Sequence, residues 1–414
     1  MNFEIKSEEI NNFKKISKEE KDFRIKNLEY FNNIGLPSKK LEDWKFTDLR
    51  EIISNNFKKL DTYQNNEKLS DFKLLEDFEH NYIILLNGSL NSFDFSFEDS
   101  NKIKIENYTE KNLKYENNKN SLVNLNHALF TNGYSLEVES NYKFKKIVII
   151  YNFFSESVEN QIINKKNKIL VKKNSELHLI DYTINNTKFV CNNYEEITLE
   201  ENSILKNISL QKDKSDGYFH KFSKNKLNKG SKYNQLLFSS GLKFNKLDLE
   251  ADLLGEDTEC NIQAGLYLNK NQHQEIKTRI NHLAPNSRSY QKIKNVLNSN
   301  AKGVYQGKIY VKDIAQKTDA YQLSKALLLN DDTEFNSKPE LEIYADDVKC
   351  SHGSTSGNVE EDSLYYLMTR GLSRKESLRL LINGFLNDIV DVIKSNTIKD
   401  FISSNLEKQI YEYK

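Results

Sequence analysis

The sequence predicts a mainly β protein, with a right-handed parallel β-helix core flanked by N-terminal and C-terminal α-helical regions. Three observations support this fold class. Short strand-like segments recur from about residue 80 to 350, a repeat of about 28 residues runs through most of that region, and helical apolar periodicity is confined to the two ends. We therefore divide the chain into an N-terminal helical region (1–75), a β-helix core (76–352) and a C-terminal helical domain (353–414).

The repeat is the strongest of these observations. Each unit places an apolar residue three positions before an Asn, Asp, Gly or similar corner residue, which is followed by Ser or Thr. Such corner residues tolerate a left-handed backbone, and we expect the neighbouring apolar residues to point inward and stack between coils. A fixed period of this length, without a helix in the unit, indicates stacked coils. The Ser or Thr position is occupied by Ser175, Ser203, Ser231, Thr258, Ser287, Thr318 and, in a degraded last unit, Val348.

The N-terminal region shows helical spacing of apolar residues, among them Ile10, Phe13 and Ile16, up to a break at Gly35. The segment LPSKKLEDWKFTDLR (36–50) follows and contains the only tryptophan, Trp44. We expect Trp44 to be a buried anchor, because a large aromatic side chain removes much apolar area from water.

The C-terminal region has the signals of helix ends. Asn358 and Glu361 have the spacing of a capping box, and Ser373 with Glu376 repeats it. Gly371 lies between the two pairs, where the end of a helix favours a left-handed residue. The predicted helices are 359–370, 374–393 and 396–411.

Composition limits the function classes. Sixty basic residues balance sixty acidic ones, which argues against a nucleic-acid partner. No apolar run approaches the ~20 residues of a membrane helix, and the N-terminus has no apolar signal segment. Three cysteines, Cys191, Cys260 and Cys350, are too few for a disulfide framework and are typical of a reducing cytosol. We therefore expect a cytoplasmic protein without a membrane or nucleic-acid partner.

The strongest candidate for chemistry is the pair Cys350 and His352. Side chains alternate along a strand, so these two residues project from one face, and they precede a segment bracketed by Gly353 and Gly357 that we expect to be flexible. A thiolate and an imidazole are ligand types that iron and iron–sulfur clusters accept. Two ligands are too few for a closed site, so the remainder would have to come from another subunit.

An alternative for Cys350 stays open at this point. The repeat register places Cys350 in the same column as Leu177, Leu205, Tyr233 and Cys260. That column predicts a buried apolar filler, a part that cysteine often plays.

Two segments carry a resemblance to a known family. VKCSHGSTSGNVEEDSLYYLMTRGLSRKESLRLLINGFL (348–386) resembles the C-terminal signature of the SufD branch of the SufB/SufD family, which assembles iron–sulfur clusters in the SUF system. The segment 36–50 is similar to the N-terminal motif of the same branch. The SufB branch would be expected to carry Glu and Ala around the histidine, where this chain has Ser351 and Gly353, and this difference favours SufD.

The resemblance implies a non-catalytic scaffold that pairs with SufB through the β-helix and docks the ATPase SufC through the C-terminal helices. It implies no permanently bound cofactor, but a transient iron–sulfur cluster or iron shared with SufB, for which His352 and, more weakly, Cys350 are the candidate residues. Three of the seven arginines lie within 370–379, and arginine forks suit interfaces. The residues expected to contribute to SufC docking are Arg370, Gly371, Arg374 and Phe385.

The predicted fold leaves two other functions open. A SufB-like scaffold would act as a homodimer, and homodimers are also possible for the isolated chain. Parallel β-helices also include enzymes that act on polysaccharides, which need carboxylates stacked on neighbouring coils. No column of the repeat stays acidic, although five acidic residues lie near the corners: Glu176, Glu200, Glu201, Glu256 and Asp257.

Overall fold

The computed structural model describes residues 5–11, 13, 16–63, 67, 72–111, 113, 118–185, 187–212, 215–238 and 241–411. The remaining parts of the predicted N-terminal helical region, and residues 412–414 of the predicted C-terminal domain, lie outside the described residues. The helices are α1 (Glu8–Asn11), α2 (Lys18–Ile34), α3 (Leu49–Asn56), α4 (Ser121–Leu129), α5 (Glu361–Thr369), α6 (Arg374–Val390) and α7 (Asn396–Tyr411), with short 3-10 helices η1 (Glu42–Trp44), η2 (Ser100–Lys102) and η3 (Glu156–Val158). None of the described helices has the length and apolar character needed to cross a bilayer.

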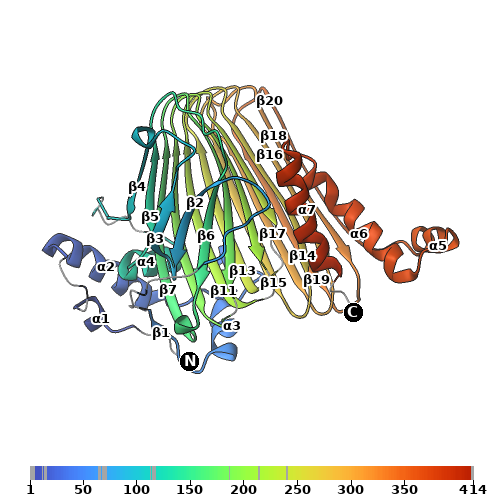
Figure 1. Cartoon of the computed structure of the whole chain (residues 1–414), viewed down its shortest axis with the longest axis horizontal. Helices are drawn as coiled ribbons and strands as arrows, with labels where there is room; N and C mark the ends of the chain where they lie inside the picture. Colours follow the sequence, from blue (N-terminus) through green and yellow to red (C-terminus); the bar gives the residue numbers. More distant parts are fainter. Residues whose placement is uncertain are drawn as a thin grey trace.

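Two ten-stranded sheets form the body of the molecule (Figure 1). Sheet A contains β1 (Asp61–Thr62), β4 (Ile103–Asn107), β5 (Tyr134–Val138), β7 (Gln161–Val171), β9 (Val190–Leu199), β11 (Ser215–Leu227), β13 (Leu242–Leu253), β15 (His273–His282), β17 (Lys302–Val311) and β19 (Glu334–Ile343). Sheet B contains β2 (Asn81–Leu86), β3 (Ser89–Asp94), β6 (Val148–Phe154), β8 (Glu176–Asn185), β10 (Ile204–Lys212), β12 (Lys232–Phe238), β14 (Glu259–Leu268), β16 (Arg288–Leu297), β18 (Thr318–Leu328) and β20 (Val348–Asn358).

From β5 onward the chain alternates between the sheets, so each coil adds one strand to sheet A and the next strand to sheet B. Successive strands of a sheet pair in parallel, except at the N-terminal end, where β2 pairs with β3 and β4 with β5 in antiparallel fashion. This arrangement is a parallel β-solenoid and confirms the predicted mainly β fold with helices at both ends.

The corners follow the repeat. The fourth residue of each of the first six units has a positive φ between 57° and 66°, as predicted for a left-handed corner. The amide of Asn174 donates to the carbonyl of Glu201 in the next coil at 2.9 Å. The Asn202 side chain donates to Asn174 Oδ1 at 3.3 Å, and that of Asn174 to Asn141 Oδ1 at 2.9 Å. Asn141, with φ 59°, thus marks an earlier coil that the sequence repeat did not include.

Inward columns fill the solenoid. Leu177, Leu205, Tyr233 and Cys260 are register partners in successive strands of sheet B, and all four are fully buried. The predicted inward stacking is therefore confirmed. Coil stacking places equivalent side chains one strand spacing apart, about 4.8 Å.

The N-terminal elements pack on the outer face of sheet A. Trp44 is 2% exposed, which confirms the predicted buried anchor, and its ring lies 4.5 Å from Lys246 Nζ and 5.9 Å from the His220 ring. Helix α4 packs on the same face and against α2. The sequence did not predict α4, because its nine residues are too short for a clear helical period within a strand-rich region.

Helices α6 and α7 pack on the outer face of sheet B, α6 against β14 and β16 and α7 against β14, while α5 contacts α6 (Figure 1). The three predicted C-terminal helices are thereby confirmed. The capping box of Ser373 and Glu376 is present, and Gly371 has a φ of 96°, as predicted. The predicted capping box at Asn358 is wrong. Asn358 is the last residue of β20, where it pairs with Leu328, and α5 begins after Glu360 without a side-chain cap.

Candidate functional site at the last coil

Both sheets end at the same coil. β19 is the last strand of sheet A and β20 the last strand of sheet B (Figure 1). Within the described part of the chain, β19 pairs along its length with β17 and β20 with β18, so the outer edge of each strand has no strand beside it. Such an edge offers a row of backbone donors and acceptors to another chain.

Cys350 and His352 lie on β20, the strand at this edge. Their register partners in β18 are Ala320 and Gln322, which are buried inside the solenoid, so both side chains belong to inward columns. The predicted common face is therefore confirmed. The two Cα atoms are about 6.6 Å apart, because each strand residue adds about 3.3 Å.

The two side chains differ in exposure. Cys350 is half-buried and packs beside the small core cluster of the last coils, which includes Ile309 and Ala320. His352 is exposed. The column-filler interpretation and the ligand interpretation of Cys350 are thus compatible, since the thiol continues the column and lies at its uncovered end.

The inward face of β20 is polar beyond the histidine. Ser354 and Ser356 continue it, and Ser324 Oγ in the previous coil donates to Ser354 Oγ at 2.9 Å. The facing strand β19 contributes Ser337, whose Oγ lies 2.8 Å from Ser324 Oγ. The stretch from Gly353 to Gly357, which we expected to be flexible, is a regular part of β20, because backbone pairing with β18 continues through it.

Burial raises the pKa of the Cys350 thiol above its ordinary value, so the thiol is neutral at physiological pH in the isolated chain. The same cause raises the pKa of Cys191 to about 11 and that of Cys260 to about 12, and both of these residues are fully enclosed. Cys350 is therefore the thiol that a second chain or a metal can reach. Among the residues that the structure describes, no three His, Cys, Asp or Glu side chains group to hold a metal ion.

The residues expected to contribute to ATPase docking separate into two places. Arg370, Gly371 and Arg374 lie together at the corner between α5 and α6, where the Arg374 guanidinium donates two hydrogen bonds to Glu361, at 2.7 and 2.9 Å. Phe385 lies farther along α6, in the seam between this helix and sheet B, with Lys294 Nζ 4.7 Å from its ring centroid. Phe385 therefore attaches α6 to the solenoid.

Helix α5 projects away from the sheets at the end of the molecule (Figure 1). Only Leu364 of this helix is buried, while Tyr365 is 70% exposed, Tyr366 57% and Met368 40%. An isolated helix with this much exposed apolar surface is typical of an interaction site.

The segment around Trp44 reaches the last coil, which the sequence did not predict. Asp43 Oδ1 forms an ion pair with Lys277 on β15 at 2.7 Å, and Glu42 forms one with Lys338 on β19. Local sequence signals could not reveal these contacts, because the partners are more than 230 residues apart. The segment thereby links the N-terminal region to the strand beside the candidate site.

These features define the class of the protein: a two-sheeted parallel β-solenoid with a projecting helical arm and an unpaired last coil that carries a thiol and an imidazole. The profile of the family described as SUF system FeS cluster assembly, SufBD core domain, matches residues 153–385, which is more than half of the chain. The chain therefore belongs to the SufBD family of iron–sulfur cluster assembly proteins, and the resemblance seen in its sequence is confirmed.

Relatives agree with this assignment. The chain is 26% identical to an iron–sulfur cluster assembly SufBD family protein of Synechocystis over 383 residues, covering 87% of this chain and 84% of the relative. It is 25% identical to the chloroplastic protein ABCI7 of Arabidopsis thaliana, covering 88% of this chain and 80% of the relative. It is also 29% identical to the iron–sulfur cluster assembly protein SufD of Escherichia coli over 158 residues, covering 38% of this chain and 37% of the relative.

Proposed function

We propose that the protein is a non-catalytic scaffold subunit of the SUF machinery that acts in the cytoplasm beside a SufB-type partner and a SufC-type ATPase. The last coil pairs with the partner's β-solenoid, and iron or a nascent iron–sulfur cluster is held as cargo at the seam. The observation that carries the proposal is the position of Cys350 and His352 on β20, at the uncovered end of the solenoid.

The free edges of β19 and β20 support the choice of this end for pairing. A partner that adds strands to both sheets would satisfy the edge backbone groups and cover the polar inward face that begins at Cys350. A second copy of the chain offers the same edges, so the isolated chain is expected to form a homodimer through the last coil. The three free cysteines support a reducing compartment, where disulfides are rare.

Coordination chemistry supports a shared cluster. Structural iron–sulfur and zinc sites take four ligands, and this strand supplies a thiol and an imidazole on one face. The partner would supply the others. Because the pKa of Cys350 is raised, binding of iron through its sulfur releases a proton and becomes stronger as the pH rises.

The exposed α5 and the α5–α6 corner support docking of the ATPase. The apolar surface of Tyr365, Tyr366 and Met368 stands clear of the body, and the corner beside it carries Arg370 and Arg374. Arg370 lies over the Tyr366 ring at 5.1 Å, so the arginine and the apolar patch form one surface. ATP-driven movement of two docked ATPase subunits would act on the seam through α6, which packs on sheet B.

The test replaces His352 by Ala in the chain co-expressed with its SufB-type and SufC-type partners. His352 is exposed, so the complex should form with unchanged stoichiometry in native mass spectrometry, while iron and sulfide bound per complex should fall about tenfold or more. His178→Ala is the matched control, because it removes an imidazole that pairs with Glu176 on the outer face of β8. Normal iron and sulfide content in the His352→Ala complex would reject the ligand role.

A further inference from the structure

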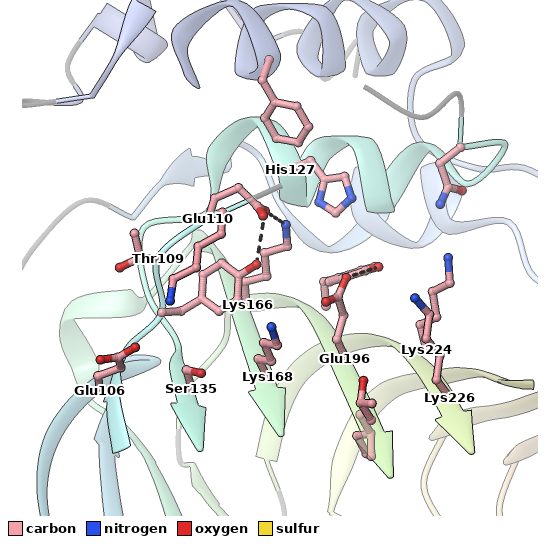
Figure 2. A pocket seen from close by; sticks show the side chains of 17 residues that line it. Glu106, Thr109, Glu110, His127, Ser135, Lys166, Lys168, Glu196, Lys224 and Lys226 are labelled. Atoms are coloured by element: carbon pink, nitrogen blue, oxygen red, sulfur yellow. Dashed lines mark hydrogen bonds and ion pairs between the residues drawn. The ribbon is translucent and has the colours of Figure 1, made fainter. Parts of the chain in front are cut away.

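A separate cavity of about 310 Å³ lies on the outer face of sheet A, beneath helix α4 (Figure 2). Its floor is formed by β7, β9 and β11, which present Lys168, Glu196 and Lys224 as register partners in three neighbouring strands. Figure 2 shows these side chains directed from the strands toward the helix that carries His127. The cavity lies on the outer face of sheet A, whereas Cys350 and His352 belong to inward columns of sheet B, so the two sites are separate.

The lining of this cavity carries more positive than negative charge. Five lysines and three glutamates contribute to it: Lys111, Lys166, Lys168, Lys224, Lys226, Glu106, Glu110 and Glu196. Two of the glutamates are already neutralised, since Glu110 forms a buried ion pair with Lys166, and Glu106 forms one with Lys104 outside the cavity at 3.2 Å. Four lysines therefore face a single remaining carboxylate, that of Glu196.

None of these four lysines forms an ion pair with any residue that the structure describes. Glu196 is engaged, because it accepts a hydrogen bond from the Tyr194 hydroxyl at 3.0 Å. The remaining positive charge is concentrated in a concave site between a sheet and a helix, and the chain as a whole has no net charge. The local excess of cations is therefore a property of this cavity.

Other groups in the cavity also suit a polar ligand. The hydroxyls of Thr109 and Ser135 lie on the rim (Figure 2). The Nδ1 atom of His127 is buried and has no hydrogen-bond partner among the described residues. The His127 ring packs edge-on against Tyr194, with centroids 4.8 Å apart, which fixes its position in the cavity wall.

We infer that this cavity binds a small, multiply charged anion, either an organic phosphate or a polycarboxylate. Lys168, Lys224 and Lys226 would contact the anionic groups, because ammonium groups form strong charge-assisted hydrogen bonds with phosphate and carboxylate oxygens. The volume is at the lower end of the roughly 300–1,000 Å³ typical of small-molecule sites, so it fits a small ligand. This inference does not rest on the proposed function of the last coil.

The test is calorimetric titration of the full chain with pyrophosphate and, separately, with citrate. We expect saturable binding of at least one probe, weakened by added salt because the contacts are ionic. Binding of pyrophosphate alone supports a phosphorylated ligand, binding of citrate alone supports a polycarboxylate, and binding of both shows that the site selects charge.

The variant Lys168→Gln/Lys224→Gln should lower the affinity about tenfold or more. Lys312→Gln is the matched control, because it removes an exposed lysine far from the cavity in the sequence and leaves the affinity unchanged. Circular dichroism checks that the double variant is folded. The inference is overturned if neither probe binds at millimolar concentration, or if both variants weaken binding equally.

Discussion

Replacing Glu275 by Gln is expected to loosen the segment around Trp44 from the outer face of sheet A. The Glu275 carboxylate is 1% exposed and accepts hydrogen bonds from Thr47 Oγ1, Lys246 Nζ and, at 2.7 Å, Gln306 Nε2. Lys246 is fully buried beneath the Trp44 ring. The substitution keeps the shape of the side chain and removes the charge that neutralises this lysine.

The magnitude follows from the contacts that remain. Breaking a buried ion pair by removing one partner costs about 3–5 kcal/mol, because a buried charge is left uncompensated. Here Asp248 Oδ1 lies 3.4 Å from Lys246 Nζ and compensates part of that charge. We therefore expect the free energy of local opening of residues 36–50 to fall by about 2–3 kcal/mol.

The assay is hydrogen exchange measured by mass spectrometry on peptides from this segment. A loss of 2–3 kcal/mol corresponds to exchange about 30- to 150-fold faster. Glu340→Gln is the control, because Glu340 pairs with Lys338 at 3.4 Å on the same face but is 45% exposed. Hydrogen exchange of residues 36–50 should therefore change little in this variant. The double variant Lys246→Met/Glu275→Leu, which replaces the pair by apolar groups, should restore most of the protection. Unchanged exchange in Glu275→Gln would show that the buried pair does not hold the segment.

Two further predictions concern the functional surfaces. Tyr365→Ser/Tyr366→Ser should reduce binding of the SufC-type ATPase about tenfold or more in a pull-down titration, with no change in melting temperature. The control Leu254→Ser, which removes another exposed apolar side chain, should leave binding intact. Equal binding by both variants would contradict docking on α5. Because the pKa of Cys350 is raised above its ordinary value of 9.0, the thiolate fraction near neutral pH is low, and alkylation of the isolated chain by iodoacetamide should accelerate with rising pH through that value. A rate that levels off below about pH 8.5 would mean that the thiolate is stabilised instead.

The regular part of the fold could be predicted from the sequence because its rules are local. A residue that tolerates positive φ must occupy each corner, so Asn174, Asn202 and Gly230 stand at a fixed distance from the strands that they connect. The same period assigns inward and outward faces, which is why the common face of Cys350 and His352 could be stated before the structure.

Predictions failed where tertiary contacts decide between two local preferences. Asn is a residue type that favours the N-cap of a helix, but pairing of β20 with β18 extends the strand through Asn358. The position of Phe385 between α6 and sheet B could not be predicted either, because it depends on where α6 packs; its part in ATPase docking stays a prediction. The lysine-lined cavity was not predicted, because its charged residues come from alternate positions of three strands. The sequence of each strand by itself predicts only a polar face exposed to solvent.

The two ends of the solenoid differ in a way that supports the proposed association at the last coil. At the N-terminal end, the antiparallel strands β3 and β4 and the segment between them close the stack, and Leu90, Phe95 and Ile105 pack against the core. At the last coil, the inward positions of β20 carry Cys350, His352 and serines, and α6 and α7 pack on the face of sheet B, not on its final edge. A solenoid needs a cap at each end to protect its core. The N-terminal cap is built into the chain, and the polar final coil is suited to a cap supplied by another subunit.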